Sequence, residues 1–343
     1  MQAKVKRVYL PRIKVYLSAL AILILVMLAV KFYAWGRQLE QATGLTPRIL
    51  FNLLVDSGSN LKTTDGRTNL LVLGIAGGSH AGADLTDTIL VLSLDSLKKK
   101  LTMISLPRDI WSDTLKDKIN SAYHYGEAKQ PLGGILLSRV IVEDMIGLPI
   151  HYVLLVDFSG FKEVIDLVGG VAVDVPQGFT DPQFPIAGKE GDECDGDPEY
   201  KCRYEVLEFK AGKQLMDGER ALKYVRSRHA EGEEGSDFAR SRRQQEVLLA
   251  LKDRLVSFGQ WASLARIRGL ISALDQMTET DIRLGELLTI TKVMSGIPSG
   301  QIKRISLEPL LEAPPLWVYG RYVLVPKEDY ASIHSFLYSQ LDL

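Results

Sequence analysis

The chain has 343 residues, of which 46% are hydrophobic and 24% are charged. This composition excludes a disordered protein and supplies enough apolar residues for one large domain or two ordinary ones. The formal net charge is −1 and the isoelectric point is near 6.6. These values exclude a general nucleic-acid binder, because such proteins carry a basic excess over a whole domain.

An uncharged apolar run at residues 15–30, continued by aromatic residues to Trp35, predicts one transmembrane helix over residues 15–35. A buried core helix fits poorly, because no polar face interrupts the run, and a cleaved signal peptide fits poorly, because no small-x-small site follows it. Residues 1–14 are basic and contain no acidic residue. The positive-inside rule therefore places this basic tail in the cytosol and everything after Trp35 outside, as in a retained signal anchor.

The rest of the chain predicts a linker followed by a folded domain. Residues 36–67 have mixed polarity and many Gly, Ser and Asn residues, which is typical of a juxtamembrane linker. Short apolar runs predict strands at residues 69–75, 88–94, 101–106, 152–157, 171–175, 302–307 and 322–325. Helical periodicity predicts helices at residues 133–147, 158–168, 217–225, 236–258, 284–296 and 328–341. Strands interleaved with helices in this way predict an α/β domain over residues 68–343, with a mixed central sheet and helices on both faces. Its core is expected at residues 69–258, with a C-terminal extension of the same domain at residues 259–343.

Residues 177–206 interrupt this pattern with Pro, Gly and acidic residues, and therefore predict a long surface excursion. Cys194 and Cys202 lie in it, eight residues apart. In an extracytoplasmic domain they suit a local disulfide, although two free thiols are nearly as compatible with the sequence. A zinc site is a poorer interpretation, because the CxxC spacing and partner histidines are missing.

The segment "YVRSRHAEGEEGSDFARSRRQQ", residues 224–245, concentrates five arginines in a nearly neutral chain. Helical spacing places Arg240, Arg243 and Gln244 on the inward face and Arg242 toward solvent. Cations near a helix N-terminus oppose the helix dipole unless an anion lies among them.

The other two of these five arginines, Arg226 and Arg228, end the preceding helical segment and can fold back toward Arg240. Several converging guanidinium groups suit a di- or pyrophosphate. Surface ion pairs with the nearby glutamates, residues 231, 233 and 234, are an equally good interpretation of the segment alone.

Two more stretches carry candidate chemistry. Arg108 and Asp109 follow the strand predicted at residues 101–106, and ligands of α/β sheets bind beyond the carboxyl ends of strands. A glycine-rich loop between two predicted strands contains His80, Asp84 and Asp87. Carboxylates near a polyphosphate usually hold Mg²⁺. A local salt bridge for the first stretch and a metal-free turn for the second remain open alternatives.

Taken together, these stretches resemble the LytR-CpsA-Psr family of bacterial cell-envelope enzymes. The resemblance rests on "LTDTILVLSLD", "ISLPRDIW", "KINSAYHYG", "VDFSGFKEVIDLVGGVAVDV", "LMDGERALKYVRSR" and "SDFARSRRQQ", which occur in the family's order. A short cytosolic tail, one membrane span and an extracytoplasmic catalytic domain also match the family. The resemblance thus implies an α-β-α domain anchored in the bacterial cytoplasmic membrane.

The resemblance also implies a function. Such enzymes are phosphotransferases that move a glycan polymer from a polyprenyl (undecaprenyl) pyrophosphate carrier to a sugar hydroxyl of peptidoglycan through a phosphodiester. The implied pyrophosphate ligands are Arg108, Arg226, Arg228, Arg240, Arg243 and Gln244. Asp87 is the implied ligand of Mg²⁺ or Mn²⁺, and the lipid is expected in a long apolar tunnel. Lys118 and Asn120 are expected to orient substrate, and a carboxylate such as Asp87 or Asp109 is the candidate proton acceptor beside Arg108.

Two positions depart from the family pattern. Ala76 stands where the family often has an aspartate after the first strand, and Leu85 stands where an arginine is usual. His80 or Asp84 is then the candidate for the missing metal ligand. Two other functions stay open: a polyprenyl-pyrophosphate hydrolase using the same pocket, and a non-enzymatic regulator of the envelope or of transcription.

Overall fold

The structure is a computed structural model that describes residues 61–78, 82–258, 269–270, 272–273 and 278–343. The chain divides into two compact units, Met1–Asp56 and Ser57–Leu343, and the second is the folded domain. The predicted transmembrane helix at residues 15–35, the basic tail before it and most of the predicted linker lie outside the described residues. Within the described ranges, no helix is long and apolar enough to cross a membrane.

A six-stranded mixed sheet forms the centre of the domain, in the order β11-β6-β1-β2-β3-β12. Its strands are β1 (Arg67–Ile75), β2 (Thr86–Asp95), β3 (Lys100–Ser105), β6 (Tyr152–Asp157), β11 (Thr278–Thr280) and β12 (Lys303–Ser306). β1 pairs in parallel with β6, and β3 with β12, whereas the other pairs are antiparallel. The charged turn at residues 95–100 closes the β2–β3 hairpin. The mixed sheet is therefore confirmed.

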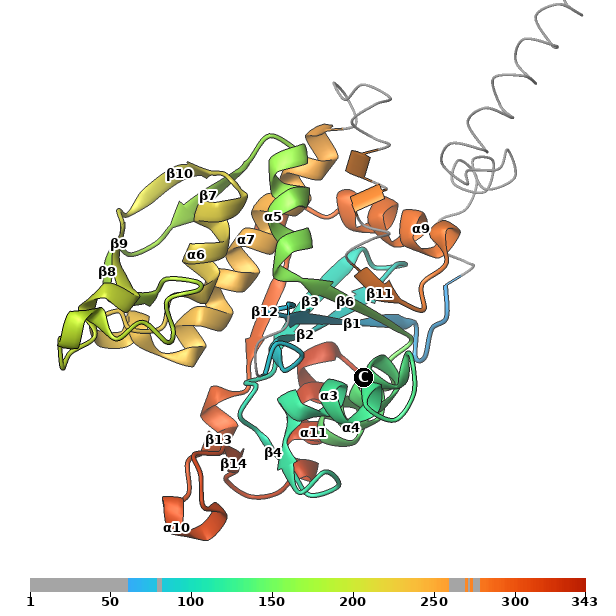
Figure 1. Cartoon of the computed structure of the whole chain (residues 1–343). Helices are drawn as coiled ribbons and strands as arrows, with labels where there is room; N and C mark the ends of the chain where they lie inside the picture. Colours follow the sequence, from blue (N-terminus) through green and yellow to red (C-terminus); the bar gives the residue numbers. More distant parts are fainter. Residues whose placement is uncertain (1–60, 79–81, 259–268, 271, 274–277) are drawn as a thin grey trace, which may run out of the picture. The chain divides into compact units, whose positions relative to one another are not determined.

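Helices cover both faces of this sheet (Figure 1), as expected from the sequence. On one face lie η1 (Ile119–Ser121), α3 (Ala122–Glu127), α4 (Gly133–Ile146) and α11 (Tyr330–Leu341). The opposite face packs against α7 (Asp237–Phe258) and α9 (Leu284–Ser295), through side chains such as Leu249 and Ile290. Each face thus has its own apolar core, one centred on Leu71 and Val91 and one on Leu90 and Leu92. This split follows from the alternation of side chains along a strand.

A second, smaller layer packs alongside α7 (Figure 1), against Val247, Ala250 and Leu251. It contains α5 (Phe158–Leu167), α6 (Gly218–Arg226) and two two-stranded sheets: β7 (Val171–Val175) with β10 (Gly212–Met216), and β8 (Phe179–Pro185) with β9 (Tyr204–Phe209). Phe179, Phe209 and Tyr224 stack in its core. The strand predicted at residues 171–175 therefore exists but pairs outside the central sheet.

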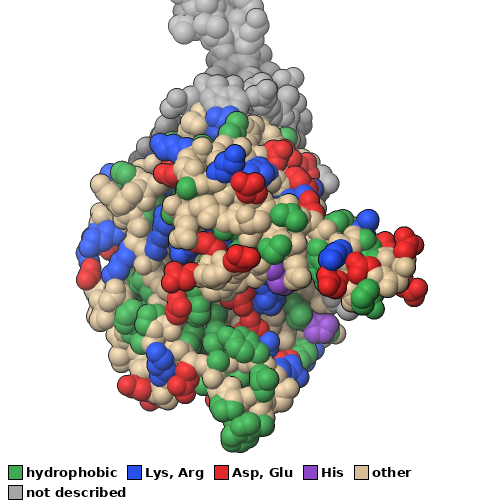
Figure 2. Space-filling model, turned by 90° about the vertical axis from the view of Figure 1, so that its left-hand side faces the viewer, with side chains coloured by type: hydrophobic (Ala, Val, Ile, Leu, Met, Phe, Trp, Pro, Cys, Tyr) green, Lys and Arg blue, Asp and Glu red, His purple; other side chains and the backbone are tan. Residues whose placement is uncertain are grey.

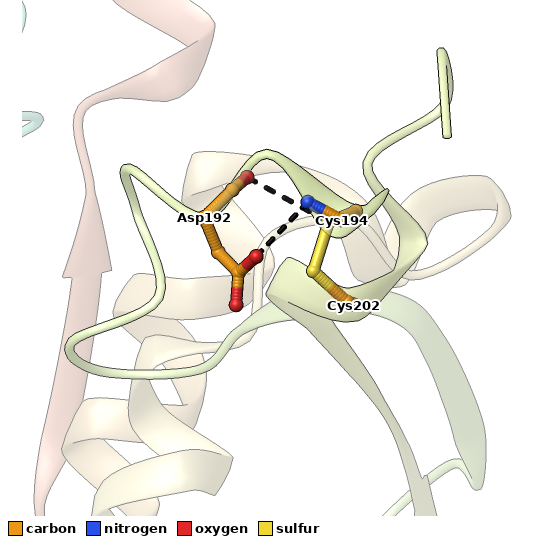
Figure 3. A group of neighbouring side chains, drawn as sticks. All are labelled: Asp192, Cys194 and Cys202. Atoms are coloured by element: carbon orange, nitrogen blue, oxygen red, sulfur yellow. Dashed lines mark hydrogen bonds between the residues drawn. A yellow bond between two sulfur atoms is a disulfide. The ribbon is translucent and has the colours of Figure 1, made fainter. Parts of the chain in front are cut away.

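The acidic excursion at residues 177–206 is largely the β8–β9 hairpin and its tip, which carries η2 (Cys194–Gly196) and η3 (Lys201–Arg203). A disulfide joins Cys194 to Cys202 across the tip (Figure 3). The structure thus decides between the two interpretations that the sequence left open, in favour of the disulfide.

The C-terminal region adds a protruding arm, residues 311–326, that leaves the domain after η5 (Ser299–Gln301) and η6 (Glu308–Leu310). It consists of β13 (Leu311–Glu312), α10 (Leu316–Tyr319) and β14 (Val325–Pro326). A similar short pair, β4 (Trp111–Ser112) and β5 (Asp117–Lys118), lies between β3 and η1. The prediction of a sheet strand over residues 322–325 was wrong, because Leu324 makes only an isolated bridge to Ile110 and Val325 pairs within the arm.

Candidate active site

The candidate site lies where β2 begins and β3 ends. These strands are antiparallel, with Leu90 opposite Ser105, so the start of β2 and the turn after β3 come together. Asp87 from β2 and Arg108 from that turn form an ion pair. The beginning of α7 brings Arg240 to the same place, where its guanidinium donates to the Asp87 carbonyl oxygen at 3.4 Å. Antiparallel pairing thus joins two stretches that the sequence treated separately.

Arg108 is an arginine whose charge is already compensated. Besides the pair with Asp87, its Nε lies 3.5 Å from a carboxylate oxygen of Asp109. Burial alone would lower the pKa of Arg108, but the two carboxylates outweigh it and the pKa is raised. Arg108 therefore stays charged and holds a fixed position at the strand end.

Asp109 is buried at 5% exposure and accepts a hydrogen bond from Lys118 Nζ at 2.5 Å. Burial would raise the pKa of this carboxyl, but the bond from Lys118 and the charge of Arg108 outweigh it and hold the pKa below the ordinary value. A carboxylate so stabilised is a weak proton acceptor. The structure thus favours a role for Asp109 in positioning Arg108 and Lys118 over its predicted role as a base.

A cavity of about 140 Å³ opens beside this cluster. Its lining is Asp87, Phe158, Phe184, Pro185, Val225, Arg226, Arg228, His229, Arg240 and Gln244. Three guanidinium groups meet one carboxylate there, so the lining carries an excess of positive charge. One wall is apolar. The space suits phosphate groups but is too small for a long polyprenyl chain, so the described cavity is not the long tunnel that the resemblance implied.

Arg240 is a deeply buried cation of the site whose hydrogen bonding is incomplete. It is 5% exposed, and its buried Nε has no hydrogen-bond partner among the described residues. Its carboxylate partner is Asp237, at 3.2 Å, which also lies 3.5 Å from Arg228. Burial, together with the charges of Arg108 and Arg228, lowers the pKa of Arg240 to about 10. An anion that entered the cavity would stabilise this buried guanidinium by accepting a hydrogen bond from its unpaired Nε.

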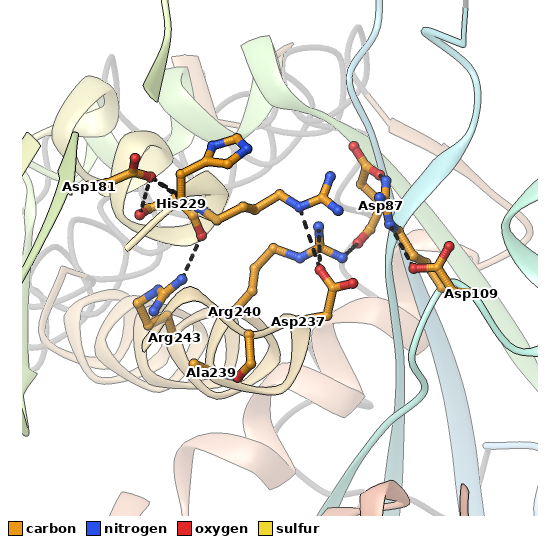
Figure 4. Close-up of polar contacts among 12 residues, drawn as sticks. Asp87, Asp109, Asp181, His229, Asp237, Ala239, Arg240 and Arg243 are labelled. Atoms are coloured by element: carbon orange, nitrogen blue, oxygen red, sulfur yellow. Dashed lines mark hydrogen bonds and ion pairs between the residues drawn. The ribbon is translucent and has the colours of Figure 1, made fainter. Parts of the chain in front are cut away.

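Helical phase is confirmed for the three arginines of α7. Arg240 and Arg243 are buried, and the Arg242 side chain is 44% exposed. The structure does not bring Arg243 into the cavity, however. Its guanidinium points away from Asp87 (Figure 4) and donates to the carbonyl oxygens of Tyr224, Ser227 and Glu234 at 2.6–3.0 Å. Bonded in this way, it fastens α7 to the end of α6 and has little capacity left for a substrate.

The N-terminus of α7 is capped by a serine. Ser236 Oγ accepts from the Ala239 amide at 3.1 Å and is therefore the cap. Asp237 is the first residue of the helix, and its carboxylate is free to pair with Arg228 and Arg240.

One residue of the site framework, Asp181, escaped the sequence analysis. It is fully buried, accepts from Ser227 Oγ at 2.6 Å, and accepts from the amides of Arg228 and His229 at 3.1 and 3.2 Å. It therefore fixes the loop that presents Arg226 and Arg228 (Figure 4). The sequence offered no reason to single out Asp181, because it belongs to the acidic excursion, where other acids such as Asp192 and Glu193 are exposed.

Of the predicted metal ligands, the structure describes Asp84 and Asp87, and each is paired with another side chain. Asp84 pairs with His124 Nδ1 at 2.6 Å, and His80 lies outside the described residues. Among the residues that the structure describes, the one group of three spaced as metal ligands is Asp192, Cys194 and Cys202 (Figure 3), and its cysteines are joined in the disulfide. Asp87 alone presents carboxylate oxygen to the cavity. This fits Mg²⁺, which typically takes one or two carboxylates, with phosphate oxygens and water as the other ligands.

The two residues expected to orient substrate lie beside the Arg108–Asp109 turn. The Lys118 ammonium group donates a hydrogen bond to the Asp109 carboxylate. Asn120 is buried, and its backbone amide donates to the Arg108 carbonyl oxygen at 3.3 Å. Both thus support the turn, and neither is part of the cavity lining in the described residues.

Fold and site together define an α/β domain with an arginine-lined anion cavity at a strand end. The model of the LytR_cpsA_psr family matches residues 47–335, and the chain belongs to this family.

Known relatives agree with this assignment. The chain is 33% identical over 246 residues to the polyisoprenyl-teichoic acid–peptidoglycan teichoic acid transferase TagV of Bacillus subtilis, covering 70% of this chain and 56% of TagV. It is 32% identical over 212 residues to the regulatory protein MsrR of Staphylococcus aureus, covering 60% of this chain and 55% of MsrR. The chain thus spans little more than half the length of these relatives.

Solved structures share the fold. The crystal structure of B. subtilis TagV matches 82% of this chain and 99% of its own, with a TM-score of 0.58 and 30% identity. The structure of TagT bound to LIIa-WTA matches 83% of this chain and 95% of its own, with a TM-score of 0.56 and 23% identity. The mixed sheet with helices on both faces is therefore the fold of the family.

Proposed function

We propose that this protein transfers a glycan phosphate from a polyprenyl-pyrophosphate carrier to a sugar hydroxyl of peptidoglycan. The observation that carries the proposal is the cavity in which Arg226, Arg228 and Arg240, whose Nε has no hydrogen-bond partner, meet beside the Asp87–Arg108 pair. Two adjoining phosphates would complete the hydrogen bonding of Arg240 and neutralise the positive excess. The name of the relative TagV supports a transferase of this kind.

The proposed reaction is a displacement at phosphorus. The acceptor hydroxyl oxygen forms a bond to the phosphorus that carries the glycan, and the bond from this phosphorus to the bridging oxygen breaks. Polyprenyl phosphate leaves, and the hydroxyl proton is released. Arg108 and Arg240 stabilise charge on the phosphoryl oxygens, which is where such a transition state concentrates charge. The apolar wall formed by Phe158, Phe184 and Pro185 would contact the lipid next to the diphosphate.

We further propose Asp87 as the protein ligand of a divalent cation, Mg²⁺ or Mn²⁺. When bound, this cation would neutralise phosphate charge and act as a Lewis acid. Arg108, which pairs with Asp87, would hold that carboxylate in place. Asp84 is not included, because its carboxylate is engaged by His124.

The proposed location is the outer face of the cytoplasmic membrane, with residues 15–35 as the single anchor and the N-terminus in the cytosol. The disulfide between Cys194 and Cys202 supports this location, because disulfides persist in oxidising compartments outside the cytosol. Topology mapping tests it directly: a cytosolic position of residues 224–245 would contradict the proposal.

The decisive experiment uses the full chain in detergent, a short polyprenyl-pyrophosphate-linked glycan as donor and a peptidoglycan-derived oligosaccharide as acceptor. Mass spectrometry should detect the glycan phosphate joined to the acceptor. Arg108→Ala and Arg240→Ala should abolish transfer. Arg242→Ala is the matched control, because Arg242 lies on the same helix but faces solvent, and it should retain most of the activity.

Two outcomes would replace the proposal. If the donor is consumed but water is the only acceptor at any oligosaccharide concentration, the protein is a polyprenyl-pyrophosphate hydrolase. If Arg242→Ala loses as much activity as Arg240→Ala, the assignment of the cavity face of α7 is wrong.

A further inference from the structure

The arm at residues 311–326 exposes an unusual amount of apolar surface. Leu316, Trp317 and Val318 at its tip are 62%, 84% and 46% exposed, and Tyr322 is 48% exposed. The arm is the lowest projection in Figure 2, where hydrophobic side chains dominate it. Clustered apolar side chains on a monomer surface commonly mark a binding site. This apolar tip has no part in the proposed reaction.

The arm is fastened to the candidate active site. The Leu324 amide donates to the Asp109 carbonyl oxygen, and the Trp111 amide donates to the Leu324 carbonyl oxygen, both at 2.9 Å. The Trp111 and Tyr319 rings pack with their centroids 4.8 Å apart. A rigid connection therefore links the arm to the turn that carries Arg108.

A polar cluster connects the arm to Asp109 on the same side. Asp117 accepts from Tyr125 Oη at 2.6 Å and from the Arg321 guanidinium at 2.9 Å. Lys118, the next residue, donates to Asp109. A path of polar contacts thus runs from the arm to the turn that carries Arg108 and Asp109.

This path lies apart from the cavity proposed for the donor. None of Asp109, Lys118, Asp117 and the arm residues is among the described residues that line that cavity. Arg108 stands between the two, since it pairs with Asp87 in the cavity lining and with Asp109 outside it. A transferase needs two substrates to meet at one phosphorus, and the second one must approach from a side that the donor leaves open.

We propose that the arm and the Asp117–Arg321 pair form a subsite for the saccharide chain of the acceptor. This inference rests on the proposed function. Sugar rings present C–H faces that pack on aromatic rings, and their adjacent hydroxyls both donate and accept hydrogen bonds. Exposed Trp317 and Tyr322 supply the rings, and Tyr125, Asp117 and Arg321 supply donors and acceptors.

A membrane surface is the rival partner for an aromatic tip, but the charges of the arm disfavour it. Membrane-binding segments combine apolar residues with several basic ones. Residues 311–326 contain one basic residue, Arg321, and one acidic residue, Glu312. Arg321 is already paired with Asp117. The arm therefore lacks the attraction to anionic lipid that such a surface requires.

The kinetic test uses the full chain in detergent and a peptidoglycan-derived tetrasaccharide as acceptor. Trp317→Ala and Tyr322→Ala should each raise the acceptor KM about tenfold, the loss expected for one aromatic contact. The donor KM and the kcat at saturating acceptor should not change. Tyr200→Ala, which removes an exposed aromatic ring on the disulfide loop, is the matched control and should leave all three values unchanged. An unchanged acceptor KM, or a rise in donor KM alone, would overturn the inference.

A binding experiment keeps this inference separate from the proposed function. Saturation-transfer NMR should detect contact between the tetrasaccharide and the unaltered protein, reduced in Trp317→Ala but not in Tyr200→Ala. Absence of transfer with this binding pattern would refute the proposed reaction and retain the saccharide subsite. Transfer with equal NMR signals in both variants would refute the subsite and retain the reaction. Because Trp317 is 84% exposed, its removal leaves the core unaltered.

Discussion

Arg240 and Arg243 offer a paired test of the difference between a binding arginine and a framework arginine. Both are buried on α7, less than one turn apart. Arg243 is bonded to three carbonyl oxygens and to Glu234, whereas Arg240 has one carboxylate partner and an unsatisfied Nε. We predict that methionine substitution affects the two positions in opposite ways.

The expected change in folding stability for Arg240→Met follows from the Arg240 pKa of about 10. A difference of one in pKa corresponds to about 1.4 kcal/mol, so the folded domain carries roughly 3 kcal/mol of unfavourable charge burial at this residue. Because the folded pKa is lowered, this cost is fully present at neutral pH and declines only as the pH rises above about 10. Arg240→Met removes it. The unliganded protein should therefore be as stable as the unaltered one, or more stable by up to about 3 kcal/mol.

Arg243→Met should do the reverse, because three carbonyl oxygens lose their donor and the buried Glu234 keeps only the half-exposed Arg242 as its partner. Breaking a buried ion pair in this way typically costs about 3–5 kcal/mol. The two variants should also differ in ligand response. A diphosphate at a hundred times its Kd should stabilise the unaltered protein by about 2.7 kcal/mol and raise its melting temperature by roughly 5 °C. Arg240→Met should lose that response.

Thermal and denaturant unfolding of the full chain in detergent, with and without geranylgeranyl diphosphate, measures both quantities. Equal destabilisation by the two substitutions would show that Arg240 is a framework residue as well. A normal ligand-induced shift in Arg240→Met would show that the anion binds elsewhere. Either result would refute the assignment of the cavity.

Three further outcomes are expected. Asp109→Asn should destabilise the protein by an amount that is constant between about pH 5 and 8 and begins to decline below about pH 4, because the lowered pKa of Asp109 makes its contribution present above the unfolded value and lost as the pH falls through the lower, folded value; pH-dependent denaturation measures this. The double variant Cys194→Ser, Cys202→Ser should make the loop more sensitive to proteolysis but retain transfer activity, because neither cysteine lines the cavity. Gly126→Ala should destabilise the domain by about 1–3 kcal/mol, because a Cβ there would lie 2.2 Å from the Gly133 carbonyl oxygen; urea unfolding tests this.

The candidate site was only partly predictable. Arg108 and Asp109 could be placed at a strand end, and the burial of Arg240 could be read from helical spacing. Helical spacing also placed Arg243 on the same inward face, but the prediction that it binds pyrophosphate does not follow from its position. Helical spacing predicts only that a side chain points inward. The neighbouring loop decides whether that side chain lines a cavity or bonds to carbonyl oxygens, as Arg243 does. Asp181 left no local signal, because its partners lie some 46 residues away along the chain.

The amino-acid sequence by itself determined the elements of the domain. Periodicity of two and of 3.6 residues is a local property, so five strands of the central sheet, all but the three-residue β11, and the helices α4 to α7 could be placed from it. Family membership followed from motifs in order. Only the tertiary structure decided that residues 171–175 pair outside the central sheet, that residues 322–325 belong to an arm, and that this arm adjoins Asp109. Such pairings depend on which distant segments compete for the same backbone hydrogen bonds, and that competition is settled only when the whole chain is packed.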